Sequence, residues 1–266
     1  MKTKQFLALL ALIVLTNACG NVKEADIPPA LTSAVTAVSA SLDSLSNSLN
    51  DAAAGLAQVG ADTAVVRSQL QRLYNECSFG SEFVFTTPEG ILQLVEPAVY
   101  YPSQGSDISQ QAHIIKAFET KLPALSDVFS VVEGYQAVVQ IHPIIAQDQL
   151  LGGVSGLFSP AYLIARNVVS IIGDNTFEIW VMEKTGVVLY NADASEIGLN
   201  VFTNPRYDQF PKMRLACEKI ASEPSGNTSF PYYETGSDKI VNRKVFWQTL
   251  TQQGNEWKFI WSKASR

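Results

Sequence analysis

An apolar repeat with alternating steps of three and four residues runs through the N-terminal part of the chain, from Val35 to Cys77, over six heptads. Its positions are Val35, Val38, Leu42, Leu45, Leu49, Ala52, Leu56, Val59, Thr63, Val66, Leu70, Leu73 and Cys77. This spacing is that of the seam of a left-handed coiled coil. We therefore expect one long helix over 31–77, with a seam about 60 Å long at about 1.5 Å per residue.

The seam has two interpretations, because a coiled coil and the buried face of a long helix can share this spacing. Few charged side chains flank it, so the ion pairs by which a dedicated zipper selects its partner are missing. The helix over 35–77 would pair with its copy in a parallel homodimer or lie along its own globular domain, and the two can coexist. Gly55 and Gly60 each weaken a helix by about 1 kcal/mol relative to Ala, so we expect a bend near them.

The first twenty residues have the pattern of an export signal. Two lysines precede an unbroken apolar run over 6–15, which is too short to span a bilayer as a helix. Cys19 follows a small residue after this run, which is similar to a lipoprotein signal: cleavage would remove the signal peptide over 1–18 and leave Cys19 as the lipidated N-terminus of a linker over 19–30. We expect an exported, extracytoplasmic protein anchored to the membrane by lipid. A signal that is cleaved without lipidation and an anchor that is retained uncleaved are the alternatives.

The amino-acid composition excludes several classes of function. Of the 266 residues, 47% are hydrophobic and 17% are charged, which suits one or two cores and excludes a disordered chain. The net charge of −6 argues against nucleic acid as a partner. His113 and His142 are the two histidines, too few ligands for a zinc site, and no spacing assembles an acid, a base and a nucleophile. We expect no enzyme activity, no cofactor and no metal.

Besides Cys19, the chain has two cysteines, Cys77 on the seam and Cys217. An exported protein meets an oxidising environment in which disulfides persist. Three states of these cysteines therefore remain as alternatives. They are two free thiols, an intrachain Cys77–Cys217 disulfide, and a disulfide between the Cys77 residues of two chains.

The rest of the chain repeats one pattern twice, over 78–172 and over 173–266. Each half begins with a hairpin, over 82–95 and over 177–190, and the two turn glycines stand ninety-six residues apart. A polar loop, a helix and a closing strand pair follow in each half. The strand pairs are expected over 135–144 with 150–158 and over 239–250 with 256–262.

Three helices are expected in these halves. In the first half Asp107 caps a helix. The apolar face of that helix comprises Ile108, Ala112, Ile115 and Leu122. In the second half Asn204 is the cap. The apolar stripe there comprises Met213, Cys217 and Ile220. A connecting helix begins after Ser159 and ends at Gly173, because a cap, a proline at the first position and a terminal glycine agree.

Several segments together resemble the double Cache domains, which are PAS-like extracellular sensors of bacterial and archaeal chemoreceptors and kinases. They are 140–144 with 151–157, 180–190 with 196–198, 246–250 and 257–261. The resemblance implies an α+β fold in which a long N-terminal helix is followed by two PAS-like antiparallel-sheet modules. The distal module with the connecting helix would span 78–172 and the proximal module 173–266. A single-Cache variant is the alternative.

The resemblance also implies where a ligand would bind. The expected ligand-binding residues, all in the distal module, are Tyr100, Tyr101, His113, Tyr135, Gln140 and His142. Strand alternation lets only Gln140 and His142 share a wall of the pocket. Family members that bind amino acids use an Arg-x-Trp-Tyr cluster, and the only arginine between 78 and 172 is Arg166, so amino-acid sensing is not expected. In the proximal module the resemblance implies three loop residues over the sheet, namely Asp193, Arg206 and Tyr207.

These observations predict an extracytoplasmic small-molecule-binding lipoprotein of the Cache sensory type that lacks its own signalling domain. Its ligand is a small molecule of unknown identity. A separate signalling or transport protein would then read the bound state. The alternative is a structural or adaptor lipoprotein that assembles through its coiled-coil helix.

Overall fold

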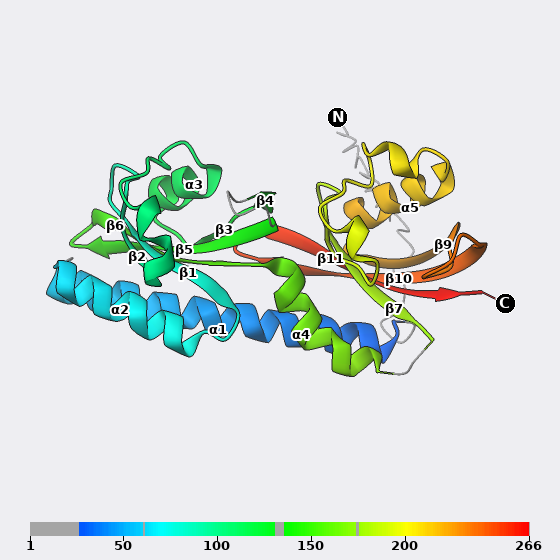
Figure 1. Ribbon diagram of the computed structural model, residues 1–266, viewed down its shortest axis with the longest axis horizontal. Coiled ribbons are helices and arrows are strands. Elements are labelled where there is room, and N and C mark those ends of the chain that lie inside the picture. Colours follow the sequence, from blue (N-terminus) through cyan, green and yellow to red (C-terminus); the bar gives the residue numbers. More distant parts are fainter. Residues whose placement is uncertain (1–26, 61, 131–135, 174–175, 266) are drawn as a thin grey trace, which may run out of the picture.

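The computed structural model describes residues 27–60, 62–130, 136–173 and 176–265. A long helix, α1 (Pro29–Val59), runs along one face of two antiparallel sheets that lie side by side, and a shorter helix covers the opposite face of each sheet (Figure 1). The fold is thus α+β with two sheet modules, as the sequence predicts. The expected signal peptide, Cys19 and most of the expected linker lie outside the described residues. Among the helices described, none is long and apolar enough to cross a bilayer.

The prediction of one helix over 31–77 is wrong, because the chain forms two helices, α1 and α2 (Thr63–Glu76), and the bend expected near Gly55 and Gly60 is a complete break at Gly60. Gly60 ends α1 with a φ of +84°, a left-handed conformation that glycine tolerates and side chains disfavour. Asp62 then caps α2 by accepting hydrogen bonds from the backbone N–H groups of Ala64 and Val65. The heptad spacing therefore continues across a turn that reverses the direction of the chain (Figure 1).

The seam itself is buried inside one chain. Along α1 the fully or almost fully buried seam positions are Val38, Leu42, Leu45, Leu49, Ala52 and Leu56, and along α2 they are Val66, Leu70 and Leu73. Helix α1 contacts strands of both sheets and the connecting helix. The seam thus serves the chain's own core, and a homodimer formed through these same positions would have to pull them out of it. Any pairing of two copies along α1 needs another face of the helix.

The first module is a sheet with strand order β2-β1-β6-β5-β3. The expected hairpin over 82–95 is present as β1 and β2, and the expected closing pair as β5 and β6. Its elements are β1 (Gly80–Thr86), β2 (Leu92–Glu96), η2 (Ala98–Ser103), α3 (Ala112–Thr120), β3 (Ala124–Leu125), β4 (Phe129–Ser130), β5 (Gln136–Ala146) and β6 (Gln149–Phe158). The short strand β4 pairs with β5 beside this sheet order.

The second module repeats this arrangement, with strand order β8-β7-β11-β10-β9. In both sheets the hairpin lies at one edge and the closing strand pair in the interior, so the repeated sequence pattern corresponds to a repeated topology. Its elements are β7 (Glu178–Glu183), β8 (Val188–Tyr190), η3 (Ala194–Glu196), η4 (Pro205–Tyr207), α5 (Pro211–Ser222), β9 (Ser225–Tyr233), β10 (Ile240–Gln252) and β11 (Asn255–Ala264).

The helix expected to begin at Asp107 begins later, at Ala112. The backbone of 106–108 pairs with the first hairpin, since Ser106 accepts from the N–H of Leu92 and Ile108 donates to Gly90, so this stretch is held extended. The apolar face shifts accordingly. The buried residues are His113, Ile114 and Ala117, whereas Ile115 and Leu122 are 39% and 63% exposed.

The other two helices agree better with the sequence. Helix α4 (Pro160–Ile172) has Ser159 as its cap, accepting from the N–H of Tyr162, and ends at Gly173. Asn204 caps only the short η4, and α5 starts anew at Pro211. The predicted stripe of α5 is buried, with Met213, Cys217 and Ile220 facing the second sheet. Cys77 and Cys217 are free thiols, so the intrachain disulfide is not formed.

The β10–β11 turn joins the two modules. The N–H₂ group of Gln253 donates to Ser46 Oγ of α1 at 2.9 Å, and its backbone carbonyl accepts from Lys116 Nζ of α3 at 3.1 Å. Next to it, Asn255 donates to the carbonyl of Ser126 at 2.8 Å. The second module is therefore held against the first through hydrogen bonds as well as through α1.

Glu183 lies at the same junction, almost fully buried, and accepts a hydrogen bond of 2.7 Å from the backbone N–H of Val128 in the first module. The pKa of Glu183 is raised to about 7, mainly by burial and also by the nearby Asp127, while the hydrogen bonds from Val128 and Thr185 act in the opposite direction. The ionised form is therefore disfavoured in the folded protein relative to the unfolded chain.

We predict that Glu183 makes the protein less stable as the pH rises. Because the pKa of Glu183 is higher in the folded state, its contribution to the free energy of unfolding is complete below about pH 4.5, where the carboxyl is protonated in both states. This contribution is lost as the pH rises to about 7. Glu183→Gln should remove this loss and be more stable than the wild type by up to about 3 kcal/mol at pH 8. Urea unfolding of both proteins from pH 4.5 to 8 measures the difference.

The comparison of variant with wild type cancels the contribution of the two histidines. Burial lowers the pKa of His113 and of His142 to about 4, so both cost stability as the pH falls from 6.5, in both proteins alike. A stability difference that stays constant across the pH range would contradict the role assigned to Glu183.

Candidate functional site

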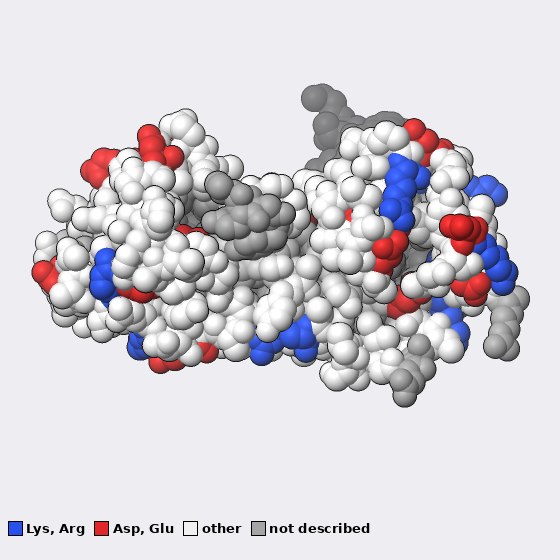
Figure 2. All heavy atoms as spheres, viewed as in Figure 1, with Lys and Arg blue, Asp and Glu red and all other residues white. Residues whose placement is uncertain are grey.

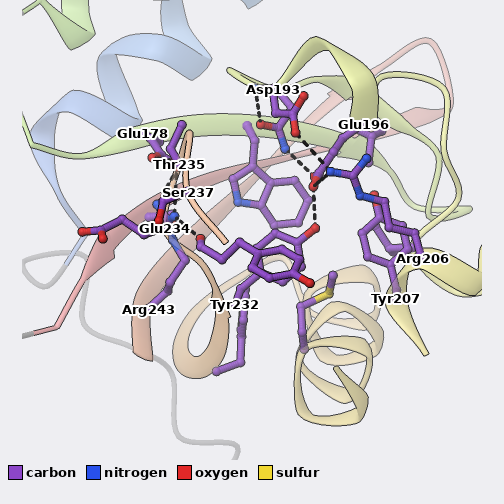
Figure 3. A pocket seen from close by; sticks show the side chains of 18 of the residues that line it. Glu178, Asp193, Glu196, Arg206, Tyr207, Tyr232, Glu234, Thr235, Ser237 and Arg243 are labelled. Carbon is purple, nitrogen blue, oxygen red and sulfur yellow. Dashed lines mark hydrogen bonds and ion pairs between the residues drawn. The ribbon is translucent and has the colours of Figure 1, made fainter. Parts of the chain in front are cut away.

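The second module contains a cavity of about 620 Å³ between its sheet, the loops around η3 and η4, and the β9–β10 turn. Charged side chains of both signs gather around a hollow in this part of the surface (Figure 2), and the close view shows them converging with aromatic rings on one space (Figure 3). A concave site with apolar walls and a few placed polar groups is the usual form of a small-molecule site.

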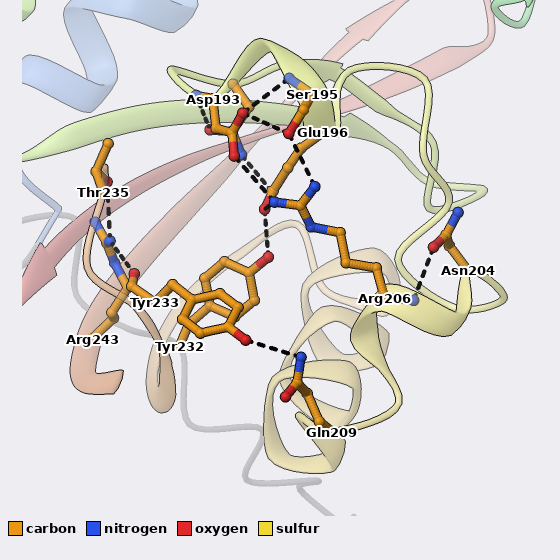
Figure 4. Close-up of polar contacts among 11 residues, drawn as sticks. Asp193, Ser195, Glu196, Asn204, Arg206, Gln209, Tyr232, Tyr233, Thr235 and Arg243 are labelled. Atoms are coloured by element: carbon orange, nitrogen blue, oxygen red, sulfur yellow. Dashed lines mark hydrogen bonds and ion pairs between the residues drawn. The ribbon is translucent and has the colours of Figure 1, made fainter. Parts of the chain in front are cut away.

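Two capped 3₁₀ turns position the first charged cluster. Asp193 caps η3 by accepting from the N–H of Ser195, and Asn204 caps η4 by accepting from the N–H of Arg206 (Figure 4). The guanidinium of Arg206 thereby reaches Asp193 at 3.1 Å, Glu196 at 3.5 Å and the hydroxyl of Ser195 at 3.0 Å. One cation is thus shared by two carboxylates.

Glu196 is the buried member of this cluster, with 6% of its surface exposed. The hydroxyl of Tyr232 donates to its Oε1, and Asn191 donates to its Oε2 at 2.9 Å. Burial raises the pKa of Glu196, while the Tyr232 hydrogen bond and the charge of Arg206 hold it down. The ionised form of Glu196 is therefore less favourable than it would be in water.

A second arginine lies deeper. Arg243 is 6% exposed, and its guanidinium donates to Ser262 Oγ at 2.7 Å, to the backbone carbonyl of Tyr233 at 3.1 Å and to Glu178 at 2.5 Å. Thr235 also contacts Glu178. These bonds fix the β9–β10 turn at the edge of the cavity and use the donors of Arg243 within the protein.

Aromatic rings form the walls. Trp180, Phe230, Tyr207, Tyr232 and Tyr233 all line the cavity. The ring of Phe210 packs edge-on against both Tyr232 and Tyr233, with centroid distances of 4.8 and 5.0 Å. The hydroxyl of the fully buried Tyr207 has no hydrogen-bond partner among the described residues. Within that same part of the chain, no group of three or more His, Cys, Asp or Glu side chains is placed to hold a metal.

The predicted ligand-binding residues that the structure describes lie in the first module, away from this cavity. The hydroxyl of Tyr101 in η2 donates to Glu96 at 2.9 Å and accepts from Arg67 at 2.6 Å, which ties η2 to α2. Its neighbour Tyr100 is half-buried in the same turn. Tyr135 lies outside the described residues. These tyrosines therefore have no described place in a ligand site.

The other three predicted residues are buried on two faces of the first sheet. His113 of α3 stacks on Phe129, whereas His142 on the α1 side lies 3.0 Å from Ser46 Oγ. Because burial lowers their pKa to about 4, both imidazoles are neutral at ordinary pH. Gln140 shares the face of His142, is fully buried, and its amide has no partner among the described residues. Ligand binding by this set stays a prediction.

Sequence reasoning reached only part of the cavity. Asp193, Arg206 and Tyr207, which the resemblance implied, do line it, together with Trp180, which the strand pattern alone would place in the core. It missed Glu178, Glu196, Tyr232, Tyr233 and Arg243. The available signal was the pair of capped turns near Asp193 and Asn204, which brings their loops to the same end of the sheet.

Comparisons with known proteins give one family model that matches part of the sequence and several solved structures that share the fold. Residues 40–160 match the family model described as "HK/GC/Chemotaxis protein-like, sensor domain". An extracellular ligand-binding receptor from Desulfohalobium retbaense is similar in structure, with a TM-score of 0.75 and 24% identity over 88% of this chain, and this chain spans 39% of that receptor.

Two ligand-binding domains from Pseudomonas chemoreceptors are also similar. That of PctB from Pseudomonas aeruginosa, in complex with L-Arg, has a TM-score of 0.67 and 12% identity over 89% of this chain and 92% of its own. That of CtaA from Pseudomonas fluorescens, in complex with L-alanine, has a TM-score of 0.65 and 14% identity over 88% of this chain and 94% of its own. No curated protein matches the sequence. At these identities the likeness establishes a shared fold.

We predict that Arg206 holds the cavity together by neutralising two carboxylates. Arg206→Ala should lower the free energy of unfolding by about 1–2 kcal/mol at pH 8, because Asp193 and the buried Glu196 would face each other without a counter-charge. The loss should shrink as the pH falls, since protonated carboxyls need no cation, and should shrink in the Arg206→Ala, Glu196→Gln double variant. Urea unfolding of each variant measures it.

Arg214→Ala is the matched control, because among the described residues Arg214 forms one ion pair, with Asp208 at 2.7 Å, and the side chain of Asp208 is 66% exposed. Surface pairs of this kind contribute at most about 1 kcal/mol. If both variants lost the same free energy of unfolding at every pH, the cluster around Arg206 would contribute no more to stability than a surface ion pair.

Proposed function

We propose that this chain, a Cache-like extracellular sensor domain by its fold, binds a small organic molecule in the cavity of its second module. The observation that carries the proposal is the cavity itself. Its buried charged groups, Glu196 and Arg243, are held by hydrogen bonds before any ligand arrives. Such a preformed site loses little on ordering when a ligand enters.

A location outside the cytoplasm is part of this proposal, and it is supported by the fold shared with extracellular ligand-binding domains and by the export signal predicted from the sequence. The similar domains of PctB and CtaA are described in complex with L-Arg and L-alanine, so a ligand of comparable size is reasonable here. The cavity of about 620 Å³ accommodates a molecule of that kind with room to spare.

We predict that a ligand found by screening will depend on the second module. A thermal-shift screen of the full chain against carboxylates, amines and nucleobases should give a stabilising compound, because a ligand at 100 times its Kd adds about 2.7 kcal/mol. Trp180→Ala should abolish the shift, since Trp180 lines the cavity. Trp180→Phe, which retains an aromatic wall, should keep most of it.

Gln140→Leu is the comparison in the first module, because its amide is buried without a partner in the described chain. The compound should still bind this variant. Binding that survives Trp180→Ala and disappears in Gln140→Leu would move the site to the first module. A broad library without any stabilising compound would count against small-molecule binding altogether.

We also propose that Cys19 carries the lipid that holds the chain at the membrane. Expressed in a host that processes lipoproteins, the wild-type chain should fractionate with membranes and Cys19→Ser should not, while Cys77→Ser, the control, should remain in membranes. Intact-mass measurement of the mature N-terminus checks for the acyl chains. A wild-type chain that is soluble and begins with unmodified Cys19 would support the simple cleaved signal instead.

A further inference from the structure

We propose that the cavity of the second module accepts a ligand that carries a positively charged nitrogen, an amine or a quaternary ammonium group, and discriminates against carboxylates and phosphates. This inference rests on the proposed function, because it assumes that the ligand binds in this cavity. It is drawn from the charges that line the cavity and from the partners that those charges already have.

The lining has more acidic than basic side chains. The acidic ones are Glu178, Asp193, Glu196, Glu234 and Asp238, and the basic ones are Arg206 and Arg243. A cavity with this excess of negative charge and low-dielectric walls attracts cations from solution. The charge excess alone would suit any cation, so the partners of each group decide where a ligand would be held.

Neither arginine is free to bind an anion. Arg243 is buried and donates to Ser262, to the carbonyl of Tyr233 and to Glu178. Arg206 donates to Ser195 and is paired with two carboxylates. A carboxylate ligand would have to break these pairs and leave an acidic group unpaired inside the cavity, which is costly for a buried charge.

The Asp193–Glu196–Arg206 cluster has one more negative than positive charge. The Glu196 side chain is 8% exposed, so solvent screens that excess poorly. A ligand ammonium placed between Glu196 and the aromatic wall would neutralise it and donate hydrogen bonds to a carboxylate that is already oriented by Tyr232 and Asn191. The cluster is thus one positive charge short of neutrality.

The other parts of the cavity suit the same ligand. Trp180, Tyr207 and Tyr232 line it, and an aromatic ring attracts an ammonium group that lies over its face. At the mouth, Glu234 and the exposed Asp238 lie on the β9–β10 turn, where Lys239 pairs with Glu234 at 3.4 Å. The entrance therefore also carries a net negative charge.

A set of probes with one apolar body and different charges tests the inference. Isothermal titration of the full chain would compare phenethylamine, its trimethylammonium derivative, 3-phenylpropionate and 2-phenylethanol. We expect the two cations to bind at least about tenfold more tightly than the carboxylate, and their affinity to fall as salt is raised from 0.05 to about 0.5 M.

Removing charge at the mouth should weaken only the cations. The double variant Glu234→Gln, Asp238→Asn should lower phenethylamine affinity by about five- to twentyfold, as expected for two partly screened charges, and change 2-phenylethanol affinity less than about twofold. The matched control is Glu119→Gln, Asp148→Asn, which removes two exposed acids in the first module and should leave both affinities unchanged. Trp180→Ala should abolish cation binding.

The outcomes separate this inference from the proposed function. Tighter binding of 3-phenylpropionate than of the cations, lost in Trp180→Ala, overturns the inference and leaves small-molecule binding in this cavity standing. Equal loss of cation affinity in the two double variants, or cation binding that survives Trp180→Ala, also overturns it, because the attraction would then be general or located elsewhere. If no probe binds and the broad screen finds no ligand, both are overturned.

Discussion

The apolar stripe of α1 is the interaction on which the rest of the structure depends. Its leucines, from Leu31 to Leu56, are buried against strands of both sheets and against α4, so a single helix supplies one wall of each module's core. A buried leucine side chain contributes about 1.5–3 kcal/mol through the area it removes from water. Neither sheet has another helix of that length to cover this face, as Figure 1 shows for the described chain. The two modules are therefore parts of one folded unit.

This shared support explains where polar groups concentrate. Most side chains between α1 and the two sheets are apolar, and polar ones gather at the junction of the modules. There Ser46 of α1 contacts His142 of the first module and accepts from Gln253 of the second, and Glu183 of the second module accepts from the N–H of Val128 in the first. The opposite face of the second sheet is only partly covered by α5 and by the loops around η3 and η4. The cavity forms there, because short capped turns cannot fill the space that a longer helix would occupy.

The first module uses its corresponding space differently. Helix α3 and its buried residues Ile114 and Ala117 pack on Val139 and Ile141, which closes that face. The repeated topology of the two modules therefore does not carry a repeated site. The sequence pattern is alike in both halves, and in both the loop before the helix forms a 3₁₀ turn, η2 or η3, and then pairs with its hairpin. The divergence comes after that pairing, where the second module has the additional turn η4 before its helix and the first module does not.

The sequence by itself determined the strand pairs, the connecting helix and the apolar seam, because periodicity, caps and turn glycines act over a few neighbouring residues, and its resemblance to double Cache domains implied the α+β class. It indicated a bend near Gly60, but it did not reveal that the chain reverses there, nor did it decide between a dimer and the chain's own core, since the same spacing serves both. Nor did it gather Glu196, Tyr232 and Arg243 into one cavity. These residues are far apart in the chain, and only tertiary packing decides which charges share a guanidinium and which are left without one.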